Sequence, residues 1–367
     1  MVAAKEQHRQ ASDGEGPERV KKPTIKEVAR LAGVSIATVS FVLNDRPGEA
    51  ISQKVKKRVW QIARQLDYHP SAMAAGLARR RTRNVAILLY NSDSAITNQF
   101  YSFVIQGAIK ETIDRHYNLL FSYMSTTYRG PIDLPKIVRE KNVEGVLVPW
   151  QVDPALIRDI QDRGISVVAV DTFPAVTGVD SLQIDNRRGG RLATDHLLDL
   201  GHERVGFLVA ASDRPSVAER GEGFREALVR RGMRFSKKEH VFSCDSFTFE
   251  GAHERILRAL QLQRRPTALF CANDEMAAGA IRAAHDLRLA VPAQLSIVGF
   301  DNIAISRFLT PALTTVSVVK EELGRRGMAR LLELVEGGER RPQTQVASVE
   351  LIVRDSTARP GRLRAEP

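Results

Sequence analysis

Seven short apolar runs, most of them separated by segments with helical periodicity, constrain the fold of this chain more than any other feature. The runs follow one another from residue 84 onward and are Val85–Tyr90, Leu119–Tyr123, Gly145–Pro149, Ser166–Val170, Val205–Ala210, Ala268–Cys271 and Ser296–Phe300. Strands that alternate with helices are typical of parallel α/β sheets. Residues 84–367 form a long segment for one sheet, so we expect two sheets.

The segment before this body differs from it in charge. Fourteen lysines and arginines lie between Lys21 and Arg83 against four acidic residues, whereas the rest of the chain holds 40 basic and 39 acidic residues. A basic module on a near-neutral body indicates a polyanionic partner, usually nucleic acid. The alternative is a solvated surface, which is the ordinary role of a charge run.

Three short helical patterns occupy the basic segment. Thr24 and Glu27 form a capping-box pattern, Gly33 ends the first helix, and Ser35 and Ser52 can cap the second and third. Three short helices with a tight glycine turn between the first two are typical of a helix-turn-helix unit; a helical hairpin without a DNA role is the alternative. We predict a helix-turn-helix domain over 23–70, after a disordered tail over 1–22.

The second helix of such a unit lies in the major groove, with its first residues at the base edges. The predicted base contacts are Ile36, Ala37, Ser40 and Phe41, and the Ser35 and Thr38 hydroxyls suit phosphate oxygens.

An ordered set of motifs in this chain resembles the lactose-repressor (LacI/GalR) family of bacterial regulators. In the basic segment these are Thr24–Ala29, Ala32–Ser35, Thr38–Ser40 and Val42–Asn44, with Tyr68–Pro70, Ala74 and Leu77 after them. In the body they are Asp185-Asn186, Gly201–Arg204, Arg220, Gly223-Phe224, Cys271–Asp274, Gly299–Asp301 and Leu313–Val316. The resemblance covers about residues 23 to 357.

The resemblance implies an all-α helix-turn-helix headpiece followed by an α/β body like the type I periplasmic sugar-binding proteins. Such a body has two subdomains, three crossovers and ligand in the cleft between them. By analogy, one subdomain takes about 84–183 plus 314–341, and the other about 184–313 plus 342–357. A hinge helix and linker are expected over 71–83, the ligand-binding and dimerisation domain over 84–357, and a tail over 358–367.

The resemblance also assigns DNA contacts. Beyond the second helix these are Thr24, Asn44, Ser52, Tyr68, Ala74 and Leu77, and Leu77 matches the residue that wedges into the minor groove. Phe41 departs from the family, which usually has arginine there. Phenylalanine cannot make the bidentate contact with guanine that arginine makes. The Phe41 ring can instead contact a thymine methyl group or pack in the core. The operator sequence is therefore left open.

The expected ligand contacts come from the same resemblance. They are Phe100, Tyr101, Asp171, Arg220, Phe247, Asn273 and Asp301. Arg220 suits a ligand hydroxyl or carboxylate, with a surface ion pair as the alternative. The polar residues that follow strands can accept from sugar hydroxyls or cap helices. Gln99 stands where the family has proline, and core packing is an equal alternative for Phe100.

We predict a ligand-responsive, sequence-specific transcriptional regulator, in the first place a repressor that binds a palindromic operator as a homodimer. The expected effector is a sugar or sugar derivative, acting as inducer or corepressor. Against an enzyme, the chain has no GxSxG, HExxH, P-loop or GxGxxG motif after a strand. Against a periplasmic binding protein, the first twenty residues have no apolar signal segment and the headpiece is basic.

Cofactors and membrane segments are not expected. Cys244 and Cys271 lack the spacing of a zinc site, so we expect no metal and two reduced thiols. No apolar run reaches membrane-spanning length. The protein is therefore expected in the cytoplasm, on the bacterial nucleoid when it is bound to DNA.

Overall fold

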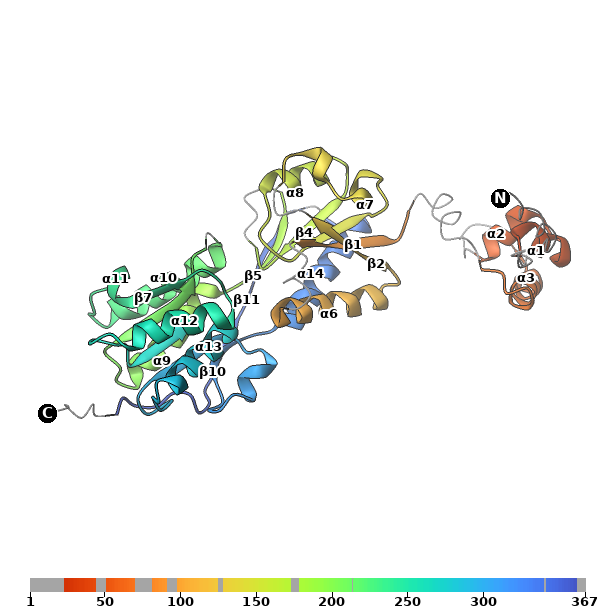
Figure 1. The fold of residues 1–367 in the computed structure, drawn as a ribbon. Helices are drawn as coiled ribbons and strands as arrows, with labels where there is room; N and C mark the ends of the chain where they lie inside the picture. Colours follow the sequence, from red (N-terminus) through yellow and green to blue (C-terminus); the bar gives the residue numbers. More distant parts are fainter. Residues whose placement is uncertain are drawn as a thin grey trace, which may run out of the picture. The chain divides into compact units, whose positions relative to one another are not determined.

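The computed structural model describes residues 23–43, 51–69, 81–90, 98–124, 128–172, 178–212, 214–339 and 341–361. Backbone contacts divide the chain into two compact units, residues 1–82 and 83–367 (Figure 1). Each unit has its own hydrophobic core, so each is described by itself.

The first unit is a small three-helix headpiece. Its helices are α1 (Ile25–Ala32), α2 (Ile36–Leu43) and α3 (Gln53–Gln65). The expected capping box is present, because the Thr24 amide donates to Glu27 Oε2 over 2.8 Å and the Glu27 amide donates back to Thr24 Oγ1. Gly33 ends α1 in the left-handed region that glycine adopts at little cost. The helices enclose Val28, Ala29, Ala32, Val39, Val42, Leu43, Val59 and Ala63.

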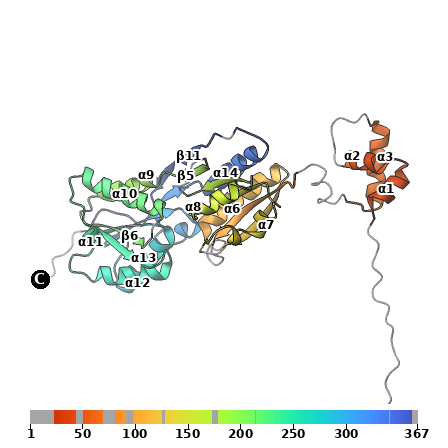
Figure 2. The ribbon, with the colours of Figure 1, turned by 90° about the horizontal axis from the view of Figure 1, so that it is seen from above.

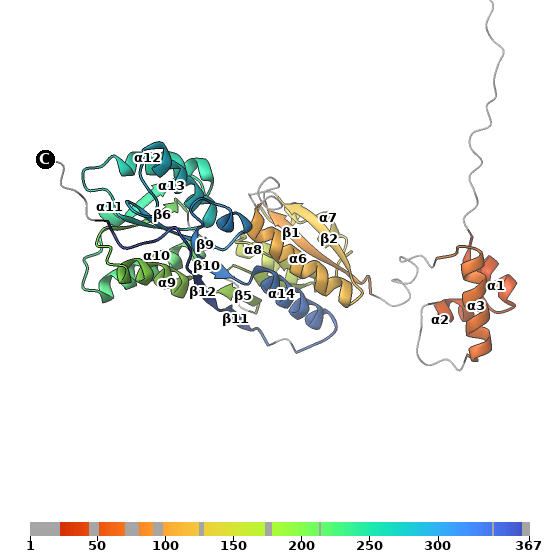
Figure 3. The same ribbon diagram turned by 90° about the horizontal axis from the view of Figure 1, so that it is seen from below.

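The second unit begins with a parallel sheet of six strands. In spatial order they are β11 (Thr344–Ala347), β5 (Asp180–Ile184), β4 (Ser166–Val170), β3 (Gly145–Val148), β1 (Asn84–Tyr90) and β2 (Asn118–Met124). Helices α6 (Gln99–Asp114) and α14 (Lys320–Val335) cover one face of this sheet (Figure 3). The short helices α7 (Lys136–Arg139) and α8 (Pro154–Gln161) lie on the other face, after the turn η1 (Pro131–Asp133).

A second sheet of six strands follows the same plan. Its order is β12 (Val349–Ile352), β10 (Thr314–Val318), β9 (Ser296–Asp301), β8 (Ala268–Cys271), β6 (Val205–Ala210) and β7 (Val241–Cys244), and only β12 is antiparallel to its neighbour. One face carries α9 (Asn186–Asp199) and α10 (Pro215–Arg230), and the other carries α12 (Phe249–Leu260) and α13 (Asp274–Asp286) (Figures 2 and 3). The short elements α11 (Lys237–His240) and η2 (Ala304–Arg307) complete this subdomain.

The chain crosses between the two subdomains three times, from β5 to α9, from β10 to α14 and from β11 to β12. This confirms the expected two-subdomain fold but corrects its boundaries. Residues 314–318 belong to the second sheet, because β10 pairs with β9 and β12 there. Residues 344–347 belong to the first sheet, because β11 pairs with β5. The crossovers therefore fall later in the sequence than the family analogy indicated.

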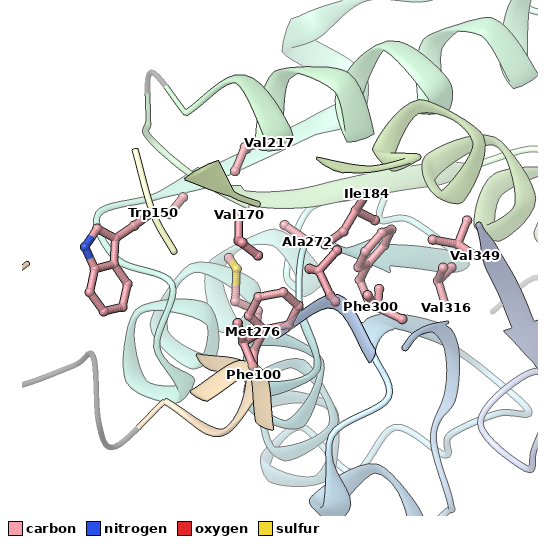
Figure 4. Packing of buried hydrophobic residues seen from close by; sticks show 14 of the residues in the cluster. Phe100, Trp150, Val170, Ile184, Val217, Ala272, Met276, Phe300, Val316 and Val349 are labelled. Atoms are coloured by element: carbon pink, nitrogen blue, oxygen red, sulfur yellow. The ribbon is translucent and has the colours of Figure 1, made fainter. Parts of the chain in front are cut away.

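All seven predicted apolar runs form strands, and buried side chains from both sheets make one continuous core. Figure 4 shows part of it, with Phe300, Ile184, Val316 and Val349 close together near the crossovers. Among the described residues, no helix is long and apolar enough to span a membrane.

Candidate functional site

The start of α2 presents the groups expected at DNA. The Ser35 hydroxyl accepts from the Thr38 amide over 3.0 Å and lies 2.9 Å from the Thr38 hydroxyl, so both hydroxyls gather at the first turn. Ile36 and Ala37 are exposed beside them, and the Ile36 side chain keeps 44% of its surface in solvent. The exposed Ile36 side chain suits apolar contact with thymine methyl groups.

The other predicted DNA contacts divide into three groups. Thr24 and Ser52 cap α1 and α3. Ser40 and Phe41 are half-buried, and Tyr68 packs against the headpiece core. Asn44, Ala74 and Leu77 lie outside the described residues, as does most of the expected hinge. Exposed cations on the same unit, Lys26, Arg30, Lys54, Lys57 and Arg58, supply the positive charge that phosphates attract.

A cavity lies between the two subdomains of the second unit. Its lining residues are Asn98, Phe100, Tyr101, Asp171, Arg214, Ser216, Val217, Arg220, Phe247, Asn273 and Asp301. All seven residues predicted from the sequence are among them. The cavity lies where parallel strands end, as expected for ligand sites in α/β sheets.

Arg220 is the buried cation of this cavity. It comes from α10, is 7% exposed, and stacks its guanidinium 3.7 Å from the centre of the Phe300 ring. Its Nε donates to Asn186 Oδ1 over 2.9 Å and its Nη1 donates to the Ala272 carbonyl over 2.5 Å. These contacts fix the orientation of the guanidinium group, so that its remaining nitrogen, Nη2, points toward Asp301.

Two carboxylates face this cation with unused acceptors. Among the described residues, neither Asp171 Oδ1 nor Asp301 Oδ1 has a hydrogen-bond partner, although both atoms are buried. Arg220 Nη2 lies 3.7 Å from Asp301 Oδ1, beyond hydrogen-bond range. Burial raises the pKa of Asp171 to about 7, although Arg220 opposes the shift. Burial likewise raises the pKa of Asp301, against the pull of Arg220 and Lys320. Buried acceptors of this kind are costly unless something donates to them.

Aromatic rings form the apolar part of the cavity. Phe100 and Tyr101 begin α6, where the Asn98 side chain caps the helix by accepting from both of their amides. Tyr101 meets Phe100 and Trp150 edge to face, at 5.1 and 5.0 Å between ring centres. On the opposite subdomain, the Phe247 ring lies under the Arg214 guanidinium at 5.3 Å.

Asn273 has both of the roles that the sequence left open, because it caps a helix and also lines the cavity. It caps α13 by accepting from the Met276 amide over 2.8 Å, and its Nδ2 donates to the Phe247 carbonyl over 3.2 Å. It therefore positions Phe247 while lining the cavity. Four lining residues were missed from sequence: Asn98, Arg214, Ser216 and Val217. The only available signal was their place at the start of helices that carry predicted residues.

Two family models match the chain. The model for "Bacterial regulatory proteins, lacI family" matches residues 24–71, and the model for "Periplasmic binding protein-like domain" matches residues 194–357. The HTH-type transcriptional repressor PurR of Vibrio vulnificus is 32% identical over 338 residues, which cover 91% of this chain and 98% of the relative. The ribose operon repressor of Escherichia coli is 33% identical over 305 residues, which cover 82% and 89%.

Solved structures give the same result. A complex of the transcriptional regulator CelR with cellobiose is 26% identical, with a TM-score of 0.67 and coverage of 91% of this chain and 99% of that one. A Lac repressor dimer bound to operator and an anti-inducer is 24% identical, with a TM-score of 0.79 and coverage of 92% and 100%. It shows the shared fold.

Headpiece, body and cavity together define a DNA-binding transcriptional regulator with a ligand-binding core, not an enzyme. The chain belongs to the LacI family of bacterial regulatory proteins.

Proposed function

We propose that this regulator represses transcription as a homodimer on a near-palindromic operator, and that an uncharged polyhydroxyl molecule, a sugar or sugar derivative, controls its affinity for DNA. The observation that carries the effector class is the pair of buried, unpartnered oxygens, Asp171 Oδ1 and Asp301 Oδ1. Hydroxyl groups of a ligand would donate to both and remove the cost of leaving them unsatisfied.

The charge balance of the cavity supports an uncharged ligand. Two carboxylates, Asp171 and Asp301, stand beside two guanidinium groups, Arg214 and Arg220. An anionic ligand would lie against the Asp301 carboxylate, and a cationic ligand would lie against the two guanidinium groups, whereas hydroxyl groups can pair with both. The rings of Phe100, Tyr101 and Phe247 suit the C–H faces of a sugar ring. A relative that represses a ribose operon and a similar structure that holds cellobiose support the same class.

The effector class is tested by thermal-shift screening of the full-length protein. The panel contains D-ribose, cellobiose, other neutral sugars and sugar alcohols, with sugar phosphates and nucleobases as comparison classes. A saturating ligand at one hundred times its dissociation constant stabilises by about 2.7 kcal/mol, which such a screen detects. Stabilisation by a neutral sugar that Asp301→Asn abolishes supports the proposal. Stabilisation only by nucleobases or phosphorylated compounds contradicts it.

The homodimer is supported by apolar side chains that the single chain leaves in solvent. Phe308 is 82% exposed and Ile305 is 43% exposed, both in the segment after β9. On the first subdomain, Ile113, Phe121 and Tyr123 are also exposed, and β2 is an edge strand that carries the last two. Exposed apolar side chains of this size suit an association surface, and the similar Lac repressor structure is a dimer on operator. Sedimentation of Phe308→Glu should show monomer where the parent shows dimer.

The operator proposal rests on the α2 face of the headpiece. Two-fold symmetry of a dimer requires a near-palindromic site. Selection from a random duplex library, read by sequencing, should return a palindrome whose half-sites present thymine methyls to Ile36 and Phe41. If the protein retains duplexes whose sequences share no two-fold symmetry, the proposal of a palindromic operator is contradicted. The expected location is the cytoplasm, on the nucleoid during repression.

A further inference from the structure

The loop that follows β9 has a backbone that needs support. Asp301 has φ 101° and Asn302 has φ 52°, both in the region that side chains other than glycine rarely adopt. Strained backbone of this kind persists only where its surroundings hold it, and it gathers at binding sites. The segment Asp301–Ala304, called the cleft loop below, carries the Asp301 side chain, whose Oδ1 accepts no hydrogen bond from the described residues.

One side of the cleft loop is held by its own subdomain. Asp274 is fully buried and accepts from the Ile303 amide over 2.8 Å through Oδ2. Its Oδ1 accepts from the Thr315 hydroxyl over 2.5 Å, and that hydroxyl oxygen accepts from the Asn302 amide over 3.4 Å. This side is part of the rigid second sheet, so it fixes the loop to β9 and β10.

The other side of the cleft loop is held from the opposite subdomain. Gln99 Oε1 accepts from the Ala304 amide over 2.7 Å. The Lys320 ammonium donates to the Asp301 carbonyl, to the Asn302 carbonyl over 3.3 Å and to the Val318 carbonyl over 3.2 Å. Because Lys320 is only 8% exposed, these carbonyl oxygens take the place of water around its ammonium group.

Gln99 and Lys320 belong to one rigid support. They are the first residues of α6 and α14, which lie side by side (Figure 1). A Cβ added at Gly107 of α6 would meet the Glu321 carbonyl oxygen at 1.9 Å, and one at Gly324 of α14 would meet the Val104 carbonyl oxygen at 1.8 Å. Backbones packed this closely move together, so any motion of the helix pair acts on both contacts at once.

We propose that Gln99 and Lys320 form a two-point clamp by which the first subdomain holds the cleft loop of the second, so that the cleft is closed and Asp301 is oriented before any effector binds. Both act as positioning residues, since neither lines the cavity. The clamp is a property of the ligand-free protein and rests on the proposed effector site only for the role of Asp301. Effector affinity then scales with the fraction of molecules that are closed.

The chain offers variants that break each contact cleanly. Gln99→Pro removes the acceptor at the first position of a helix, where proline is well tolerated, and Gln99→Glu keeps an acceptor oxygen there. Lys320→Met removes the donors and keeps the length of the side chain. Lys110→Met is the matched control, because Lys110 lies on α6 and pairs with Glu321, the neighbour of Lys320, without contacting the loop.

The test measures the distance between the subdomains in the full-length protein without ligand. Spin labels are placed by Glu140→Cys and Glu239→Cys, at exposed positions on different subdomains, and the native Cys244 and Cys271 are buried. Labelled chains are diluted in unlabelled protein, so pulsed dipolar spectroscopy reports distances within one chain. The parent, Lys110→Met and Gln99→Glu should give one main distance.

Gln99→Pro and Lys320→Met should each populate a second distance. For Gln99→Pro, the loss of one net hydrogen bond changes the closed-to-open ratio about fivefold to tenfold. Lys320→Met removes more than one donor contact and should change the ratio at least as much, and the double variant should change it further. The clamp proposal is overturned if Gln99→Pro and the parent give the same distribution of distances between the two labels. It is also overturned if the parent already shows two distances. If Lys320→Met does not fold, the test rests on position 99: Gln99→Pro should show the second distance, and Gln99→Glu should not. No sugar is present, so failure of the proposed effector to bind leaves this result unaffected.

Discussion

Replacement of Arg220 by methionine tests whether the cavity is built around a buried cation. Methionine keeps an apolar chain against Phe300 and removes every donor. The Asn186 Oδ1 and Ala272 carbonyl acceptors, held at 2.9 and 2.5 Å, lose their partner. Asp301 loses the cation whose Nη2 lies 3.7 Å from its Oδ1.

The expected loss of stability follows from these contacts. A buried acceptor left unsatisfied costs about 1–3 kcal/mol, and removal of one member of a buried charge pair costs about 3–5 kcal/mol. Since the orphaned Asp301 can take up a proton, we expect the lower end, about 3 kcal/mol at pH 7.5. Without Arg220 the pKa of Asp301 rises further, so protonation relieves the penalty and the loss should shrink as the pH falls toward 5.

Urea unfolding followed by tryptophan fluorescence measures this loss. The chain has two tryptophans, Trp60 in the headpiece and Trp150 in the body, so a Trp60→Phe background reports the body alone. Arg214→Met is the control, because Arg214 is exposed and should cost less than about 0.5 kcal/mol. Addition of Asp301→Asn to Arg220→Met should recover about 1–2 kcal/mol. A loss below about 1 kcal/mol, or one equal at both pH values, would refute the reasoning.

Three further predictions concern DNA and pH. Operator affinity should fall steeply between 50 and 200 mM salt, by about a thousandfold for six phosphate contacts, and a flat response in fluorescence anisotropy would contradict a basic headpiece on DNA. Leu77→Ala should keep effector binding and weaken specific operator binding in gel shifts, because the residue matches the family wedge; equal binding would remove that role. The folded-state pKa of Asp171 is raised to about 7 from its ordinary value of 3.8, so the folded state holds a proton that the unfolded state has lost. The free energy of unfolding should therefore fall as pH rises from about 4 to 7, and Asp171→Asn should flatten that fall in urea titrations, whereas parallel curves would count against it.

Much of the fold could be predicted because buried parallel strands are apolar along their whole length. Strand β5 escaped prediction because a polar residue at its start finds its partner far along the chain. Asp180 at the start of β5 pairs with Arg330 over 2.9 Å, 150 residues later, and such a partner is not visible in a local pattern. β11 and β12 are outer strands with exposed positions, so their alternation is weak.

The candidate cavity shows the same division. The family resemblance selected Asp171, Asn273 and Asp301, and their places after apolar strands agree with the rule that ligands bind where parallel strands end. Arg214 lies in a segment with ordinary surface composition, so only its place before the helix that carries Arg220 marked it. The hydrogen bonds that Lys320 donates go to backbone carbonyls, which no side-chain pattern reveals.

The most direct test of the account measures operator affinity with and without effector. A fluorescent duplex carrying the selected palindrome is titrated with full-length protein, alone and with a saturating neutral sugar from the thermal-shift screen. The account predicts a change in operator affinity of about fivefold or more in either direction for the parent, and none for Asp301→Asn, which still binds DNA. A sugar that binds the parent in the cleft and leaves its operator affinity unchanged would contradict the central claim that the cavity controls the headpiece.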